Sequence, residues 1–322
     1  MSMAPRPGLL QLAGREAPAL YVIGLFFAVV GSAALVAGIA GAGTGLAILG
    51  LFFVGIGGVA LSGASALQRR VDTPEAGWRG PGPLAIFWTA ITWALLAQLL
   101  VGALLTALGA AAALSTPLGA LVLVTASNIA TVLIIGLVVV GSGAVRWRDL
   151  VLATPAASPS TLPQPDRRGG LAGDLSWGAA LALPILAATG LVSTLVMNGT
   201  GLSAPPVLPL TMTAGDLVAN ALTAGLIAPI GEELLYRGVI AQAWARQSSA
   251  RRAILFSAIV FAFVHTLNPN LDSINLAAVA FIVRLPLGIA LGWLWMRRRS
   301  LLAAIALHSA YNLAIVAIIA LS

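Results

Sequence analysis

The chain is a succession of long, nearly unbroken runs of apolar residues. Nine runs approach or exceed about 20 residues, the length an α-helix needs to cross the hydrocarbon core of a bilayer. They cover roughly residues 19–38, 45–67, 83–112, 119–145, 177–197, 215–245, 253–271, 273–296 and 300–321. Glycine and proline mark the turns between them. The pattern predicts an all-α fold: a polytopic bundle of about eight or nine transmembrane helices.

Composition supports this prediction. Of the 322 residues, 59% are hydrophobic and only 8% are charged, and a soluble domain of this length has no core that could bury so many apolar side chains. The chain has no cysteine, which excludes disulfides, thiolate metal ligands and cysteine nucleophiles. Any catalysis must therefore use oxygen or imidazole groups.

The positive charges predict an orientation in the cell membrane. All 17 basic residues are arginine, the net charge is +7, and the arginines gather in alternate loops between the apolar runs. This is the distribution that the positive-inside rule describes, and it argues against a nucleic-acid partner, which would favour one folded basic surface. We expect a multi-pass protein in contact with the lipid bilayer, with its N-terminus in the cytoplasm. The absence of lysine suggests a GC-rich bacterial genome.

One segment divides the chain. Residues 146–176 are rich in proline, serine and alanine with mixed charges, a composition typical of a flexible linker. We therefore expect an accessory bundle of four helices in residues 1–145 and a second, catalytic bundle in residues 177–322. The four apolar runs of the first bundle contain no charged residue and no histidine, so the chemistry is expected in the second.

Two carboxylates and a guanidinium interrupt the sixth run: Glu232, Glu233 and Arg237. An ionisable group at bilayer depth costs about 2.5 kcal/mol or more, so such groups mark functional sites. Glu233 and Arg237 are four residues apart and share a helical face, which predicts an ion pair between them. The pair leaves Glu232 available. Pro229 removes a backbone donor just before the cluster and can open the helix there.

The only two histidines, His265 and His308, also lie in or at the end of later apolar runs, and Asn312 follows His308 by one helical turn. Measured from the nearest flanking arginines, Glu232, His265 and Asn312 all lie at a depth of roughly 20 Å. Helices running in alternating directions would bring these groups to one level. We therefore expect Glu232 to turn towards His265, His308 and Asn312.

Two chemistries fit this group of residues. A carboxylate held away from bulk water can act as a general base on a water molecule and then protonate a leaving amine. Alternatively, Glu232, His265 and His308 are a reasonable set of three ligands for Zn²⁺ with an open fourth position. In both, His308 or Asn312 could donate a hydrogen bond to a developing oxyanion. Arg284, midway along the eighth run, needs an acidic partner or contacts the substrate.

The residues resemble the CPBP family of intramembrane proteases, which includes the type II CAAX prenyl endopeptidases and bacterial relatives named for bacteriocin processing or immunity (the Abi family). That family carries three motifs on successive helices: Glu-Glu-x-x-x-Arg, Phe-x-x-x-His and His-x-x-x-Asn/Asp. Here they are Glu232-Glu233 with Arg237, Phe261 with His265, and His308 with Asn312, in the same order. The resemblance extends roughly from residue 177 to the end.

The resemblance implies an endopeptidase that cleaves a membrane-associated peptide or protein, in some relatives a lipidated one. It implies Glu232 as the water-activating base, with His265, His308 and Asn312 lining the site. Glu233 and Arg237 would be the supporting pair, with Phe261 and Arg284 in lesser roles. The family is often described as metalloproteases, whereas its eukaryotic branch is argued to be metal-free, so the cofactor is either zinc or none.

Two other functions remain open from the residues alone. A proton- or ion-coupled transporter also places Glu, His and Arg near the middle of the membrane beside a proline-broken helix, although the two halves of the chain show no corresponding repeat. A non-catalytic immunity or scaffold protein could keep the same fold. The chain lacks the His-Glu-x-x-His motif of site-2 proteases, and it has no convincing rhomboid-type serine nucleophile. An aspartyl intramembrane protease needs two aspartates, and no second intramembrane aspartate accompanies Asp216.

Overall fold

The computed structural model describes residues 17–73, 77–151, 170–202, 209, 213–267 and 273–321, and every secondary-structure element in them is helical. Nine helical stretches of this described part are long and apolar enough to cross a membrane: Pro18–Ala42, Thr44–Asp72, Pro83–Ala107, Pro117–Val140, Gly170–Thr200, Ala214–Ala245, Ala250–Leu267, Ile274–Arg298 and Leu301–Leu321. Helices satisfy all of their own backbone hydrogen bonds, which the bilayer core requires. The predicted polytopic helical bundle is confirmed.

Two boundaries differ from the predicted ones. The fifth membrane helix, α6 (Gly170–Thr200), begins before residue 177. The predicted run starts too late because Asp174 and Ser176 interrupt the apolar pattern at the beginning of this helix. The third, α3 (Pro83–Ala107), ends before residue 112 because Gly109 adopts a left-handed conformation with φ of 74°. A 3-10 turn, η2 (Ala111–Ser115), follows it.

The predicted linker is helical at both of its ends. Residues 147–151 form the short helix α5 (Trp147–Val151), and residues 170–176 belong to α6. Residues 152–169 of the linker, like the N-terminal residues 1–16, lie outside the described part of the chain.

The described helices form two compact units. One comprises residues 1–100 and 130–146, and the other comprises residues 101–129 and 147–322. This division groups residues 101–129 with the C-terminal helices, whereas the sequence pattern places a domain boundary at the linker. The assignment of residues 1–145 as an accessory bundle stays a prediction.

Close packing of two helices characterises the first unit. Helix α1 (Pro18–Ala37) continues into a π-helical turn, η1 (Gly38–Ala42), and α2 (Thr44–Asp72) returns against it. Gly31 faces the backbone of Gly50 and Val54 so closely that a Cβ atom could not be accommodated. Small residues of this kind let membrane helices approach each other. The unit also contains the start of α3 and the π-helical turn η3 (Ile135–Val140).

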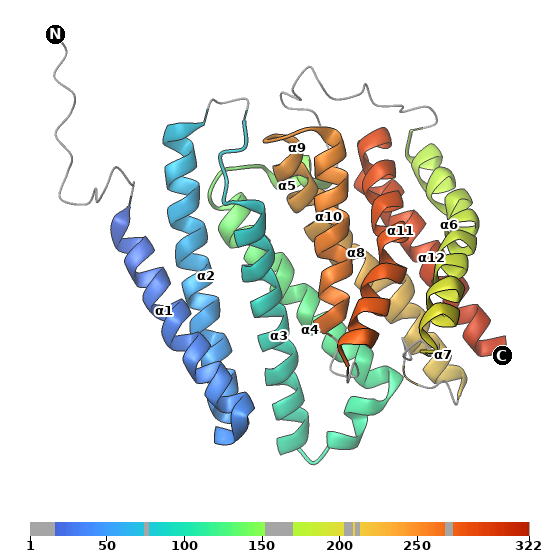
Figure 1. Cartoon of the computed structure of the whole chain (residues 1–322), viewed down its shortest axis with the longest axis horizontal. Helices are drawn as coiled ribbons and strands as arrows, with labels where there is room; N and C mark the ends of the chain where they lie inside the picture. Colours follow the sequence, from blue (N-terminus) through green and yellow to red (C-terminus); the bar gives the residue numbers. More distant parts are fainter. Residues whose placement is uncertain are drawn as a thin grey trace, which may run out of the picture. The chain divides into compact units, whose positions relative to one another are not determined.

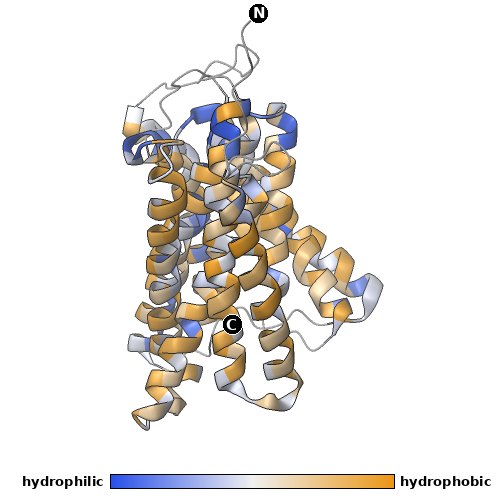
Figure 2. Cartoon of the chain, turned by 90° about the vertical axis from the view of Figure 1, so that its left-hand side faces the viewer, coloured by the Kyte–Doolittle hydropathy of each residue, from blue (hydrophilic) through white to orange (hydrophobic). Residues whose placement is uncertain are grey.

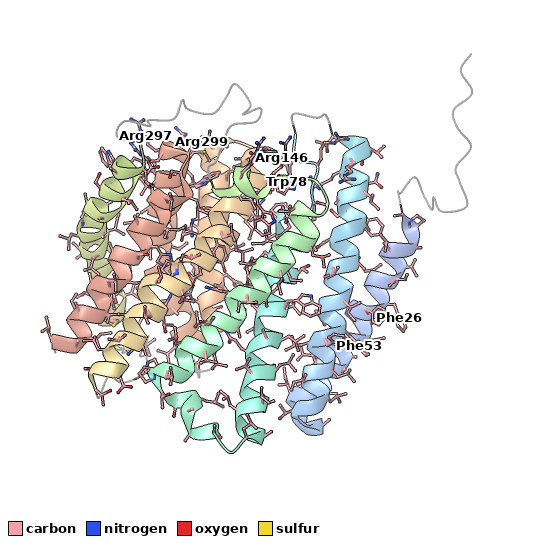
Figure 3. The ribbon with its side chains drawn as sticks, turned by 180° about the vertical axis from the view of Figure 1, so that it is seen from behind. Phe26, Phe53, Trp78, Arg146, Arg297 and Arg299 are labelled. Atoms are coloured by element: carbon pink, nitrogen blue, oxygen red, sulfur yellow. The ribbon has the colours of Figure 1, made fainter. Side chains whose placement is uncertain are left out.

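Trp78 anchors the loop between α2 and α3. Its side chain is fully buried and its indole nitrogen donates to the carbonyl oxygen of Pro81 at 2.6 Å. In Figure 3, Trp78 lies at the loop end of this unit, near Arg146, whereas Phe26 and Phe53 lie part of the way along α1 and α2.

The second unit contains the residues singled out by the sequence. Its elements are the first part of α4 (Pro117–Ile134), then α5, α6, α7 (Ala214–Leu222), η4 (Thr223–Ile227), α8 (Ala228–Glu233), η5 (Leu234–Ala241), α9 (Gln242–Ala245), α10 (Ala250–Val264), η6 (His265–Leu267), α11 (Ile274–Arg298) and α12 (Leu301–Leu321). Helix α12 packs mainly against α6, and α10 packs mainly against α11, as Figure 1 shows.

Polar side chains cap the N-terminal ends of three of these helices. Thr213 and Asp216 form a reciprocal capping box at the start of α7, and Ser249 and Ser273 cap α10 and α11. Such caps satisfy the free backbone N–H groups of a first turn. Between the caps the helices are predominantly hydrophobic, as the colouring in Figure 2 makes clear.

A buried ion pair joins two helices at the arginine-rich end of the second unit. Arg298, at the end of α11, is 2% exposed and places both Nε and Nη2 2.8 Å from Oδ1 of Asp174 in α6. Arg297 and Arg299 flank it at the same end (Figure 3). The pair holds the beginning of α6 against the end of α11.

Candidate active site

The sixth membrane span is not a continuous α-helix. Two π-helical segments, η4 and η5, alternate with the α-helical segments α7, α8 and α9. At the end of η4, the N–H of Ala228 bonds to the carbonyl of Thr223, five residues earlier. In this register the next residue, Pro229, would bond to the carbonyl of Ala224, but proline has no N–H. The span therefore opens one turn before Glu232.

The carbonyl that Pro229 cannot reach is satisfied from another helix. Nδ2 of Asn312, in α12, donates to the carbonyl oxygen of Ala224 at 2.8 Å. An unsatisfied backbone carbonyl in hydrocarbon would cost several kcal/mol. Asn312 thus has a definite structural partner, and it ties α12 to the opened turn.

Glu233 forms the centre of a buried polar cluster. Its side chain is fully buried, and Oε1 accepts a hydrogen bond from Nη1 of Arg237 at 3.0 Å and lies 2.8 Å from Nδ1 of His308. Arg237 is fully buried as well, and its Nη2 donates to the carbonyl of Gly288 at 2.9 Å. The predicted contact between Glu233 and Arg237 is thus present, and its links extend to α11 and α12.

Phe261 packs at the centre of this cluster. The guanidinium carbon of Arg237 lies 4.8 Å from its ring centroid, within the range of a cation–π interaction. The ring also makes edge contacts with His265 at 4.8 Å, with His308 at 5.7 Å and with Tyr236 at 5.4 Å. One aromatic side chain therefore contacts both imidazoles and the buried cation.

Both imidazole rings are oriented through Nδ1. In His265 this atom lies 2.7 Å from the carbonyl oxygen of Phe261, and in His308 it lies 2.8 Å from the Glu233 carboxylate. A carbonyl and an ionised carboxylate can only accept hydrogen bonds, so Nδ1 carries the proton in each ring. In the neutral form of each ring, Nε2 then carries the free lone pair.

Glu232 differs from Glu233 in its surroundings. Its side chain is 28% exposed, whereas that of Glu233 is fully buried, and its Oε2 lies 3.8 Å from Nε2 of His308. That oxygen has no hydrogen-bond partner among the described residues. The separation from His308 is longer than a direct hydrogen bond. Glu232 is thus the carboxylate that is free to bind something else.

Arg284 is a cation of α11 whose charge interacts with the Glu232 carboxylate. It is partly buried in α11 and interacts electrostatically with Glu232 and Tyr311. Its Nη1 donates to the carbonyl of Ala280, in its own helix, at 3.3 Å. In the described residues it has no acidic group within ion-pair distance, so no structural ion pair of the expected kind holds it.

The structure brings most of the expected residues together. Side-chain contacts connect one cluster of six residues: Glu232, Glu233, Arg237, Phe261, His265 and His308. The sequence predicts that His308 lies near Glu232, and Nε2 of its ring is 3.8 Å from that carboxylate. The shorter contact of His308 is made by Nδ1, with Glu233. Asn312 contacts the backbone before the cluster. The catalytic roles of all these residues remain predictions.

Sequence reasoning missed Asn128, which lies in α4, a helix expected to carry no chemistry. Its Nδ2 donates to the carbonyl of Ile227, and its amide lies against Gly231, next to Glu232. A single amide inside an apolar run was the only available signal, and nothing in the sequence indicates its partner.

A zinc site would require three of the ligand groups to converge. No three carboxylate or imidazole groups of the described chain converge closely enough to hold a metal ion, and the 3.8 Å between Glu232 and His308 is spanned without a third ligand. A zinc site formed by Glu232, His265 and His308 therefore stays a prediction, and the chemistry below is derived without it.

Comparison with known families matches this region. Residues 214–314 match the model of the type II CAAX prenyl endopeptidase Rce1-like family. The matched segment includes all three motifs, from Glu232 to Asn312, which confirms the resemblance over these residues. No curated protein and no solved structure matches the chain.

Proposed function

We propose that the protein is an intramembrane endopeptidase that hydrolyses a peptide bond in a membrane-associated, in some cases lipidated, protein or peptide. The family match over residues 214–314 supports a CAAX-type protease. The observation that carries the proposal is the contrast between two adjacent carboxylates. Arg237 and His308 fix Glu233 through its Oε1, although its Oε2 has no partner among the described residues. No hydrogen bond of the described residues fixes Glu232, and its Oε2 faces Nε2 of His308.

The reaction begins with a water molecule between Glu232 and the imidazoles. An unprotonated Nε2, such as that of His308, accepts one hydrogen bond from this water and orients its oxygen. The Glu232 carboxylate accepts the other hydrogen bond. As the oxygen attacks the scissile carbonyl carbon, one water proton passes to Glu232 and the carbonyl becomes an oxyanion. The C–N bond then breaks, and the proton passes from Glu232 to the leaving amine nitrogen.

The surrounding residues hold this geometry. The bond from His308 to Glu233 and the bond from His265 to the Phe261 carbonyl fix the two rings. Arg237 pairs with Glu233 and holds its Oε1 where Nδ1 of His308 can donate to it. The side-chain amide nitrogen of Asn312 has two hydrogens. It donates one to the carbonyl of Ala224, so the second is available for the oxyanion.

The test is hydrolysis of membrane-anchored peptides by purified protein in detergent. Glu232→Gln removes the general base and is expected to lose at least about 100-fold in kcat. His265→Ala removes an imidazole that orients the water and should also lower kcat. Asp216→Asn makes the same carboxylate-to-amide change at a helix cap, away from the cluster, and should cleave at the wild-type rate. If both site variants cleave as fast as wild type, the site is wrong. Proton-coupled solute flux in liposomes without cleavage would instead indicate a transporter.

A further inference from the structure

The contact between α4 and the span that carries Glu232 suggests a role for a residue outside the matched family segment. Asn128, in α4, donates from Nδ2 to the carbonyl oxygen of Ile227. Residues 101–129 belong to the same compact unit as the site, although the family match begins only at residue 214. A helix outside the matched segment therefore touches the backbone next to the cluster.

The place of this contact is informative. Ile227 is the last residue of η4, immediately before the short helix that contains Pro229 and ends at Glu233. Pro229 leaves this turn one backbone hydrogen bond short. Asn312 supplies the missing bond from the α12 side, at Ala224, and Asn128 adds a contact from α4, at the carbonyl of Ile227. Two side-chain amides from different helices thus hold the opened turn from both sides.

Gly231 allows the approach of Asn128. A Cβ atom on Gly231 would overlap the side-chain amide of Asn128, with Oδ1, Cγ and Nδ2 as its nearest neighbours. The glycine is buried and directly precedes Glu232. The absence of a side chain at this position therefore lets Asn128 sit against the backbone that sets the direction of the Glu232 side chain.

We propose that Asn128 is a positioning residue for the reaction: it fixes the backbone from Ile227 to Gly231 and thereby the location of the Glu232 carboxylate. This inference rests on the proposed function, because it assigns a role in hydrolysis. Asn128 acts through Glu232 in this role and needs no contact with the substrate. Displacement of a reacting group by about 1 Å can cost about 100-fold in rate, so an anchor of this kind affects turnover more than binding.

The first experiment compares Asn128→Leu with wild type, using cleavage of a membrane-anchored peptide together with the thermal unfolding midpoint in detergent. Leucine keeps the approximate volume and removes the donor. We expect kcat to fall at least about tenfold while KM changes less than about twofold. Thr125→Val is the matched control: it removes a side-chain hydrogen bond one turn earlier in α4, where Thr125 bonds only to Leu121 of its own helix. Its kcat should equal that of wild type.

Three results would overturn the assignment: an unchanged kcat in Asn128→Leu, a change confined to KM, or a loss of kcat that merely follows the folded fraction. The control variant guards against a general effect of removing polar groups from α4. A similar loss of kcat in Thr125→Val would also count against Asn128.

A double-mutant cycle tests the contact without any substrate. Gly231→Ala alone should lower the unfolding midpoint because its Cβ meets the Asn128 amide, and Gly231→Ala combined with Asn128→Ala should recover part of that loss. In the same double variant kcat should stay low, because the donor is missing. Additive effects on the midpoint would refute the contact. If wild type cleaves no peptide, the proposed function fails with the role in hydrolysis, while the cycle still decides whether the contact exists.

Discussion

His308 and Arg237 share one oxygen atom of Glu233: Nδ1 of His308 lies 2.8 Å from Oε1, and Nη1 of Arg237 donates to it at 3.0 Å. The buried carboxylate therefore connects the sixth and ninth membrane spans through a single atom. Its neighbour Glu232 has no such link. The two glutamates should consequently respond differently to the same substitution.

Glu233→Gln is expected to destabilise the protein, because it leaves the Arg237 guanidinium buried without a counter-charge. Breaking a buried pair in this way costs about 3–5 kcal/mol. Glu232→Gln should leave stability nearly unchanged and remove hydrolysis. Thermal unfolding in detergent, measured beside peptide cleavage, separates the two. Equal unfolding midpoints for both variants would contradict the assignment of Glu233 as the supporting carboxylate.

A chelator distinguishes the two chemistries that the residues allow. With the described geometry, we expect purified wild-type protein to keep its cleavage rate after extensive dialysis against EDTA, and to contain no stoichiometric zinc by elemental analysis. The control is a known zinc protease treated in parallel. Loss of activity that returns on addition of Zn²⁺ would favour metal chemistry with Glu232, His265 and His308 as ligands.

Arg284→Gln should affect substrate binding. The guanidinium has no acidic partner within ion-pair distance in the described residues, yet it interacts electrostatically with Glu232, so it is available for an anionic group of a peptide. We expect KM for a peptide with a free C-terminal carboxylate to rise about tenfold, with little change for the same peptide bearing a C-terminal amide. Equal effects on both peptides would exclude a role in carboxylate recognition.

Asp174→Asn should lower stability without altering the chemistry. Arg298 is 2% exposed and both of its contacts to Asp174 are 2.8 Å long. Loss of this charge removes the carboxylate that both Nε and Nη2 of the buried guanidinium contact, which destabilises the folded state. The unfolding midpoint should fall, while kcat measured at a temperature where the variant is folded should match wild type. A changed kcat would mean that this end of the bundle influences the site.

The sequence predicts the membrane helices well because hydrocarbon imposes one simple rule on them, a sufficiently long apolar run. It also predicts the contact between Glu233 and Arg237, which depends only on spacing within one helix. The same rule fails at the start of α6. There, Asp174 interrupts the apolar run within the helix, and its partner Arg298 lies 124 residues away in the sequence.

Partnerships between helices could not be predicted in the same way. The pattern predicts that His308 lies near Glu232, and its Nε2 is 3.8 Å from Oε2 of that residue. The pattern does not indicate that the other ring nitrogen, Nδ1, contacts Glu233 at 2.8 Å. Asn312 and Asn128 each donate to a backbone carbonyl, and a hydrophobicity pattern contains no information about which carbonyls are free. The π-helical turns are equally invisible, because they leave the apolar composition of a span unchanged.

Those turns have a consequence for how the sixth span tolerates change in length. A π-helical turn holds one residue more than the α-helical register would place there, so deletion of one residue from Thr223–Ile227 could relax η4 into an ordinary helix. Hydropathy and span length would hardly change. Deletion of one residue from a regular α-helix turns everything beyond it by about 100°, but in η4 the turn gives up its extra residue and the flanking segments nearly keep their relative orientation. The sixth span should therefore tolerate a one-residue deletion in η4 better than one in α7, where no extra residue absorbs it.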